Sequence, residues 1–547
     1  MKKATAVLLV FVLTITYFLS SCSLFDDGKG KDLYYPIYSD TSSFDPQIAE
    51  DEASSIVCVN CFEGLVKYDS EGNIVPGVAK SWEISSDGLT YIFHLDENAK
   101  WNMNSDAKEI LLSYTIDKFN EKVTADDFVF GLRRYFDPQM KTKSDARLYL
   151  IENAFDVADG SKALSKLGVK AVDSNTLQIK LSSKSDTFLG ALTSGAAMPC
   201  REEFFLATKG RYGLDAKYII CNGPFYLAYH SESTYIQMKK NENYFLKDTV
   251  CPANVYLYIN TDEVSRINKL ETNVYDACPI NIEQKQGIKE KKISFKAYQN
   301  STWGFCFNCS DEMLANKDLR VAICQSIDIN TLEIPSYTTG IAQGIVPDVC
   351  TLGEKSYRKE AGKAEFLEFS EINAKQSFDS AMDSLDKSVI SLTLICPADL
   401  ENDMRRLIQN WQKNLGMSLE IKIEPMTIDE INEKIENDDY QIAFSYVSSS
   451  FSSTADFLDM FTHNNEFECF NYTSLSYTNA VIDASKAVNV KDMTKKCLKA
   501  ENMLLQNGVF YPAFSEESFL ALAKGVCDVY FTYAGTIPVF KNGKRVS

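Results

Sequence analysis

The most reactive side chains in this sequence are thiols. Two cysteine pairs have the Cys-x-x-Cys spacing, namely Cys58 with Cys61 and Cys306 with Cys309. Four thiolates can hold a structural zinc ion, and a single pair can carry thiol–disulfide exchange. The two pairs lie in different halves of the chain, however, and Cys306 stands in an alternating, strand-like stretch. We therefore expect most cysteines to be small buried side chains, and we predict neither a metal nor a cofactor.

Other catalytic chemistry has little material in this chain. Only three histidines are present, and His94 lies in a strand-like segment where a packed structural role is expected. The sequence contains no P-loop, no Gly-x-Ser-x-Gly motif and no His-Glu-x-x-His motif. The acidic pair Asp126–Asp127 follows Thr124 and is explained by helix capping. We predict that the protein is not an enzyme.

Cys22 offers a different chemistry, since its thiol can take a lipid. A basic start at Met1–Lys3 is followed by the apolar run Ala4–Leu19 and then by Ser20, Ser21 and Cys22. This order is typical of an export signal, and Leu-Ser-Ser-Cys resembles the bacterial lipobox, in which the cysteine is acylated and becomes the mature N-terminus. We expect residues 1–21 to be a signal peptide and residues 22–31 a flexible tether. An ordinary secretory signal with a chance cysteine is the alternative.

Composition limits the remaining possibilities. After residue 21 about 525 residues remain, which is too many for one hydrophobic core, so two or three domains are expected. The 56 basic and 75 acidic residues give a net charge of −19, which argues against nucleic acid and against a basic membrane-binding face. No later segment approaches 18 uninterrupted apolar residues. Contact with the cell membrane is therefore predicted through the lipid anchor only, on its extracytoplasmic face.

Hydrophobic periodicity predicts mixed secondary structure. Strands are expected at 32–38, in a hairpin over 82–95 and in a second hairpin over 169–181, and a helix begins after Thr124. In the second half, strands at 391–395, 418–423 and 441–446 alternate with helices at 404–414 and 428–435. Strands that alternate with helices imply parallel strands in an α/β layer.

Several short motifs follow one another along the chain: Phe62–Val66 (FEGLV), Pro76–Trp82 (PGVAKSW), Val123–Phe128 (VTADDF), Leu167–Asp173 (LGVKAVD), Asn222–Phe225 (NGPF), Asp318–Ala322 (DLRVA) and Asp456–Leu458 (DFL). In this order they resemble motifs of the oligopeptide- and dipeptide-binding proteins that serve ABC importers. The resemblance as a whole runs from about residue 33 to about residue 530. Seven motifs in the same order carry far more weight than any one of them.

This resemblance implies an α/β fold like that of periplasmic binding proteins, with two α/β lobes, a hinge and an extra β-rich domain. The implied signal peptide and tether are followed by three parts: lobe I (32–61, 191–292 and 511–547), the extra domain (62–190) and lobe II (293–510). A ligand would be enclosed when the lobes close.

The resemblance also points to candidate ligand-contacting residues. Peptide binders of the family carry a Trp, then an Asp three positions later, and that Asp binds the α-amino group of the peptide. Counting back from Phe457 places Val447 and Ser450 at these positions, so the acidic anchor is absent. The candidate residues are Tyr446, Val447, Ser449, Ser450 and Phe451, together with Trp303 at the start of a strand. Core packing explains the aromatic residues equally well.

The function expected from the resemblance is capture of a solute, with an oligopeptide as the first choice. The protein would deliver it to ABC transporter permease subunits and act as a monomer. The absence of an acid at Ser450 leaves two alternatives open: an oligosaccharide or other solute as the ligand, or a sensor of the same fold that does not serve transport.

Overall fold

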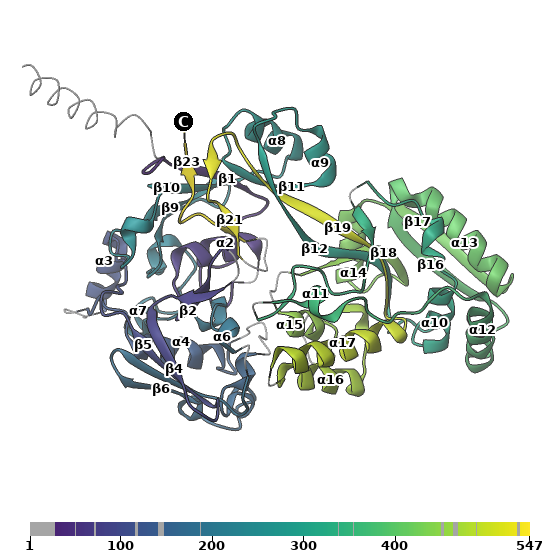
Figure 1. Cartoon of the computed structure of the whole chain (residues 1–547), viewed down its shortest axis with the longest axis horizontal. Coiled ribbons are helices and arrows are strands. Elements are labelled where there is room, and N and C mark those ends of the chain that lie inside the picture. The colour runs from purple at the N-terminus through teal and green to yellow at the C-terminus, as the bar shows by residue number, and fades with distance from the viewer. Residues whose placement is uncertain are drawn as a thin grey trace, which may run out of the picture.

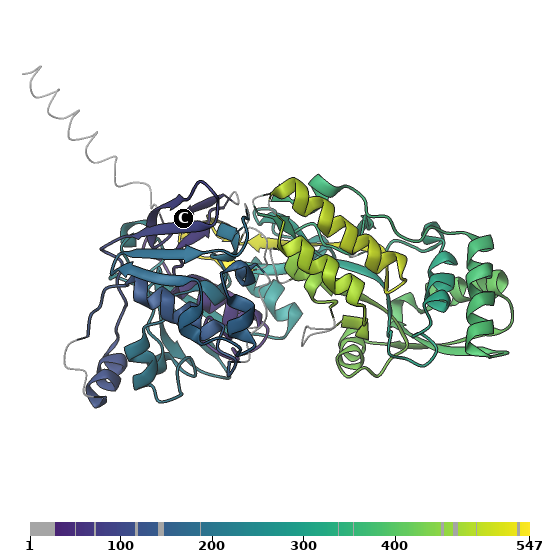
Figure 2. The same cartoon turned by 90° about the horizontal axis from the view of Figure 1, so that it is seen from below.

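The computed structural model describes most of the chain after residue 27. The described residues are 28–49, 51–70, 73–114, 119–140, 147–185, 188–336, 338–353, 355–449, 453–462, 469–487, 489–532 and 537–546. The predicted signal peptide, Cys22, Ser450 and Phe451 lie outside these ranges. Two bodies lie end to end along the long axis of the molecule, and two long strands, β12 and β19, run from one to the other (Figures 1 and 2). Among the described helices, none combines the length and apolarity needed to cross a bilayer.

The first body contains a four-stranded sheet in the order β1-β10-β9-β8. Strand β1 (Leu33–Ile37) runs parallel to β10 (Asn254–Ile259), and β9 (Tyr235–Lys240) and β8 (Phe225–His230) follow in antiparallel pairing. The strand predicted at 32–38 is thereby confirmed. Val255 and Leu257 of β10 point into the core, and the neighbouring Tyr256 and Tyr258 point outward.

A second four-stranded sheet of the first body is fully antiparallel. Its strands are β4 (Ala79–Ile84), β5 (Thr90–Leu95), β7 (Thr176–Lys180) and β6 (Val169–Asp173), in that order. Both predicted hairpins are confirmed. Helix α4 (Ala125–Tyr135) begins after Thr124, where Thr124 and Asp127 form the expected capping box.

Short elements complete the first body. They are α2 (Glu52–Cys61), β2 (Val66–Tyr68), β3 (Ile74–Pro76), α3 (Ser105–Ser113), α5 (Ala154–Ala158), α6 (Phe188–Ala191), α7 (Glu202–Ala207), α8 (Glu263–Glu271), β11 (Ala277–Asn281), α9 (Ile282–Gly287), β20 (Val526–Cys527), β21 (Tyr530–Phe531), β22 (Pro538–Val539) and β23 (Lys544–Arg545). One continuous apolar cluster fills this body and draws on residues 33–293 and 519–540. The predicted boundary between lobe I and an extra domain stays a prediction.

The second body is built on a mixed sheet in the order β11-β19-β12-β18-β16-β17, with β13 (Thr338–Ile341) paired to β19. Strand β16 (Ile390–Pro397) is parallel to both β17 (Leu419–Met426) and β18 (Ile442–Ser448). Helices α13 (Glu401–Leu415) and α14 (Ile428–Glu436) connect them. The predicted parallel α/β layer is confirmed.

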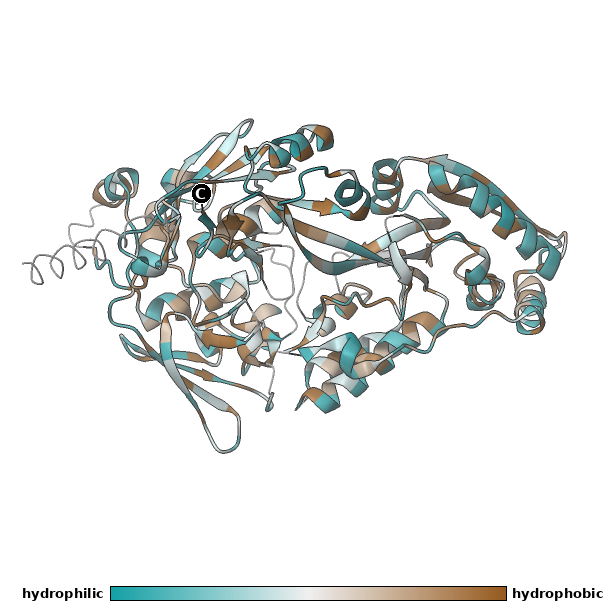
Figure 3. Ribbon diagram, turned by 45° about the horizontal axis from the view of Figure 1, so that its top comes forward, coloured by the Kyte–Doolittle hydropathy of each residue, from teal (hydrophilic) through white to brown (hydrophobic). Residues whose placement is uncertain are grey.

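Helices cover both faces of this sheet, and two separate apolar clusters form. One cluster lies toward α10 (Lys317–Gln325), α12 (Glu371–Leu385) and α13; the other lies toward α15 (Thr454–Asp459), α16 (Leu475–Ser485) and α17 (Val490–Gln506). Two short strands, β14 (Thr351–Leu352) and β15 (Lys355–Ser356), precede α11 (Tyr357–Ala361). Figure 3 shows hydrophilic colour on the outer turns of the peripheral helices, as an amphipathic helix over a sheet requires.

The strands β12 (Ser294–Phe307) and β19 (Phe510–Leu522) belong to both bodies. Near Ser294 the pair continues into β11 of the first body, and from Ser301 onward β12 also pairs with β18 of the second. The register shifts between Tyr298 and Ser301, where one pairing set gives way to the other. Trp303 therefore lies inside a strand and not at its start. The residues before Ser301 are mostly polar and either exposed or half-buried, so the hydrophobic pattern did not reveal the first half of the strand.

The cysteines are mostly core residues, as expected. Eleven of the thirteen that the structure places are buried. Cys58 and Cys61 lie within α2, and burial raises the pKa of both thiols well above its usual value, so neither is reactive at neutral pH. Within the described ranges, no three His, Cys, Asp or Glu side chains come together as metal ligands.

A buried carboxylate provides a test of the second body. Glu501 of α17 has no exposed side-chain surface; it accepts hydrogen bonds from Tyr357 Oη and Arg358 Nη2, both at 2.6 Å. We expect Glu501→Gln to lower the free energy of unfolding by about 3 kcal/mol, because Arg358 would keep a buried charge without its counter-ion. Urea denaturation measures this change.

The matched control is Asp379→Asn in the exposed pair Lys375–Asp379 of α12. Its effect should stay below about 0.5 kcal/mol, as for most surface ion pairs. Equal effects of the two variants would contradict this account of the second body.

Candidate functional site

Two of the predicted site residues meet where the bodies join. Trp303 of β12 lies opposite Tyr446 of β18, and their ring centroids are 5.1 Å apart. The indole Nε1 of Trp303 donates a hydrogen bond to Glu516 Oε2 at 2.9 Å. Trp303 is only 6% exposed, and burial raises the pKa of the Tyr446 hydroxyl, opposed by a hydrogen bond with Asn432. The three strands thus hold an aromatic pair against a carboxylate.

The other described candidates lie on the opposite face of the sheet. Val447 belongs to the apolar cluster beneath α15, whereas Tyr446 packs against the cluster on the other side. Ser449 is buried, and its backbone N–H donates to Asn300 O at 2.9 Å. Successive residues of a strand alternate between faces, so the run from Tyr446 to Ser449 cannot line a single surface. Ser450 and Phe451 lie outside the described residues.

Glu516 is a candidate residue that the sequence analysis did not name. It stands in the middle of β19, half-buried, and burial raises the pKa of its carboxyl, opposed by the hydrogen bond from Trp303. In the part of the chain that the structure describes, no cationic side chain lies within salt-bridge distance of it. The sequence carried one signal, which is an acidic pair, Glu516–Glu517, inside an otherwise apolar strand.

Glu52 is a second missed carboxylate, and it belongs to the first body. It is the first residue of α2, next to the capping residue Asp51. Desolvation by the surrounding protein, and then the neighbouring charge of Asp51, raise the pKa of Glu52 to about 7, although its surface is exposed. As with Glu516, no cation among the described residues pairs with it.

Tyr298 connects the two carboxylates in space. After burial itself, the negative charges of Glu52 and Glu516 are among the causes that raise the pKa of the Tyr298 hydroxyl. Both carboxylates are therefore close to this one residue of β12, at the point where the strand passes between the bodies. Two carboxylates without a cation, next to aromatic rings, form an arrangement suited to a ligand ammonium group.

A further ion pair joins the two bodies directly. Arg147 of the first body and Asp456 of α15 form a salt bridge, with 3.1 Å between Nε and Oδ2. The two side chains are only 9% and 2% exposed. A buried charge without a counter-ion is costly in free energy, so the two side chains stabilise each other here. If the bodies moved apart, both charges would return to water.

The sequence matches those of known proteins over most of its length. The model of a family described as "Bacterial extracellular solute-binding proteins, family 5 Middle" matches residues 73–468. A dipeptide-binding protein of Lactococcus lactis subsp. cremoris is 24% identical over 90% of this chain and 90% of its own. The oligopeptide-binding protein OppA of Bacillus subtilis is 25% identical over 85% of each chain.

Solved structures show the same fold. The structure of Listeria monocytogenes OppA bound to peptide superposes with a TM-score of 0.73 at 22% identity, covering 94% of this chain and 99% of that one. The predicted fold class, with its two α/β lobes, and the predicted family resemblance are both confirmed.

The raised pKa of Glu52 generates a test. Its carboxyl has an ordinary value of 4.5 and a folded value of about 7, so its contribution to stability is full below pH 4.5 and is lost as the pH rises through 7. Replacement by a neutral amide removes this loss. We expect Glu52→Gln to exceed the wild type in stability above pH 7 by about 1 kcal/mol, a value reduced for solvent screening.

Urea denaturation at pH 5 and at pH 8 measures the effect. Glu202→Gln, at an exposed position of α7, is the matched control and should give the same difference from wild type at both pH values. A pH-independent Glu52→Gln effect would contradict the assignment.

Proposed function

Since the chain belongs to family 5 of the bacterial extracellular solute-binding proteins, we propose that it captures an oligopeptide between its two bodies and delivers it to the permease of an ABC transporter. Members of this family bind solutes and do not catalyse reactions, so the prediction that the chain is not an enzyme is confirmed. The names of its relatives support an oligopeptide as the ligand. They are called dipeptide- and oligopeptide-binding proteins, and they match most of the chain.

The observation that carries the proposal is the carboxylate of Glu516 beside Trp303 and Tyr446. With Ser450 in place of the usual acid, the α-amino group of a peptide needs another anion. Glu516 and Glu52 supply two carboxylates near Tyr298, and neither is neutralised by a described cation. A carboxylate facing an ammonium group forms a charge-assisted hydrogen bond, which is about twice as strong as a neutral one. The main chain of the peptide would pair with strand edges, and this tolerates many sequences.

The bridge between Arg147 and Asp456 supports closure as part of the function. Opening separates the bodies and breaks a buried ion pair, and closure re-forms it around the ligand. The pair thus stabilises the closed arrangement without touching the ligand.

The predicted lipid anchor at Cys22 belongs to this proposal. An acylated cysteine would keep a monomeric carrier at the extracytoplasmic face of the cell membrane, close to its permease. The predicted alignment favours a second candidate: it puts Ser450, with its hydroxyl, where peptide binders have a carboxylate, which suits an oligosaccharide or another ligand that has no free amine. A sensor of the same fold would bind its ligand in the same place.

Calorimetry with paired peptides tests the proposed site. A peptide pool with free amino termini should bind about tenfold more tightly than the same pool after N-acetylation, because only the free amine meets Glu516 and Glu52. Glu516→Gln should remove this preference while leaving the affinity for the acetylated pool unchanged.

Glu517→Gln is the control, since Glu517 is the next residue of β19 and points to the other face. If oligosaccharides bind and neither peptide pool does, the peptide is excluded as the ligand.

Small-angle scattering tests closure. Arg147→Leu should populate a more open form, because the closed form would lose the buried ion pair between Arg147 and Asp456. The radius of gyration should rise, and affinity for the ligand should fall about tenfold. Lys162→Leu, which removes the exposed pair with Asp156, should change neither quantity. An unchanged radius in Arg147→Leu would show that the bridge does not govern closure.

A further inference from the structure

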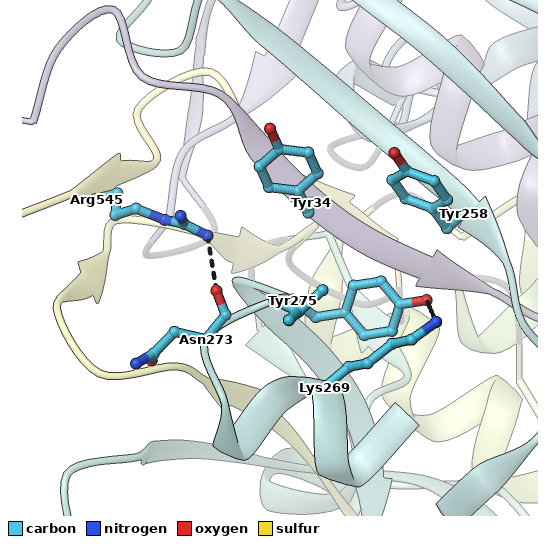
Figure 4. A pocket seen from close by; sticks show the side chains of 7 residues that line it. Tyr34, Tyr258, Lys269, Asn273, Tyr275 and Arg545 are labelled. Carbon is cyan, nitrogen blue, oxygen red and sulfur yellow. Dashed lines mark hydrogen bonds between the residues drawn. The ribbon is translucent and has the colours of Figure 1, made fainter. Parts of the chain in front are cut away.

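A cavity lies on the first body, apart from the residues of the proposed ligand site. Its volume is about 410 Å³, and it is lined by Tyr34, Tyr258, Lys269, Asn273, Tyr275 and Arg545 (Figure 4). It sits at the edge of the four-stranded sheet, where β1 meets the end of α8 and the C-terminal strand β23. A volume of a few hundred Å³ is the size of a small-molecule site.

The sheet side of this cavity is aromatic, although the core does not require it. Tyr34 and Tyr258 project from the outer face of β1 and β10, since Leu33, Tyr35, Val255 and Leu257 fill the inner face. Tyr34 stacks on Tyr256, with centroids 5.3 Å apart and planes 10° from parallel, and lies 6.3 Å from Tyr258. These residues form a row of rings on the surface. Their faces are apolar and their hydroxyl groups are polar.

The opposite side of the cavity carries two cations with different surroundings. Arg545 is neutralised, since its Nε lies 2.7 Å from Oδ1 of the buried Asp276. Lys269 donates from Nζ to Tyr275 Oη at 3.5 Å, and within the described ranges no carboxylate lies at salt-bridge distance from it. Figure 4 shows Arg545 directed at the backbone oxygen of Asn273 and Lys269 directed at the hydroxyl of Tyr275. The cavity therefore keeps one positive charge without a counter-ion, on a protein whose net charge is −19.

We propose that this cavity binds an acidic saccharide. A sugar ring presents C–H groups to the negative face of an aromatic ring, and its hydroxyls can pair with the hydroxyls of Tyr34 and Tyr258. A carboxylate on the sugar forms a charge-assisted bond with Lys269. An aromatic acid would make no use of the tyrosine hydroxyls, and a free phosphate ion would make no use of the ring faces. The saccharide satisfies all three kinds of group.

Calorimetry on the whole chain without its predicted signal peptide tests this proposal. The probes are a trimer of galacturonic acid and a neutral trimer of galactose. The acidic trimer should bind at least about tenfold more tightly, and its affinity should fall as salt is added. Lys269→Met should abolish the preference for the acidic trimer, and Tyr34→Leu should weaken both trimers.

Lys289→Met, at an exposed lysine of the same body, is the matched control and should bind like the wild type. Circular dichroism verifies that each variant is folded. Glu516→Gln should also bind like the wild type, which separates this cavity from the proposed peptide site. Equal affinity for the two trimers, an unchanged Lys269→Met variant or no binding at millimolar concentration would each overturn the proposal.

Discussion

The structure depends on the hydrogen-bonded pair of strands β12 and β19. Each strand contributes to the sheet of the second body and continues into the first, so one ladder fixes the position of both bodies. The register shift between Tyr298 and Ser301 lies where the two strands run from one body into the other. A bulge in a ladder bends and twists it locally, and this is a place where the angle between the bodies can change without breaking either core. Separate apolar clusters on the two sides of the passage are consistent with two bodies that keep their own packing.

The same ladder explains why the candidate site is placed there. Tyr298, Trp303 and Glu516 all belong to β12 and β19, so their positions relative to both bodies are set by backbone hydrogen bonds. Glu52 approaches from α2 of the first body. Glu501 is a useful contrast: this buried carboxylate has an arginine, a tyrosine and a backbone amide as partners, and its role is structural. Glu516 has one indole N–H, which leaves capacity for a ligand.

Much of the fold was predictable because it is encoded locally. Alternation over 82–95, the capping box at Thr124 and the strand–helix alternation from Ser391 onward each specify an element within a short window, and the ordered motifs specified the family. The site was less accessible. Trp303 and Tyr446 were both named from the sequence, but their contact depends on the register of two strands that are far apart in sequence. Val447 and Ser449 were grouped with Tyr446 through sequence proximity, which strand alternation contradicts. The tertiary fold alone brings Glu52 and Glu516 each into the neighbourhood of Tyr298 and brings Arg147 to Asp456.

The central claim is that this protein captures an oligopeptide. Native mass spectrometry tests it most directly, on the chain after residue 22, purified without denaturation from the growth medium of its own organism. Our account predicts a closed monomer that carries a heterogeneous set of co-purifying peptides, which acid releases and sequencing identifies. A single non-peptide mass, such as an oligosaccharide, would contradict it.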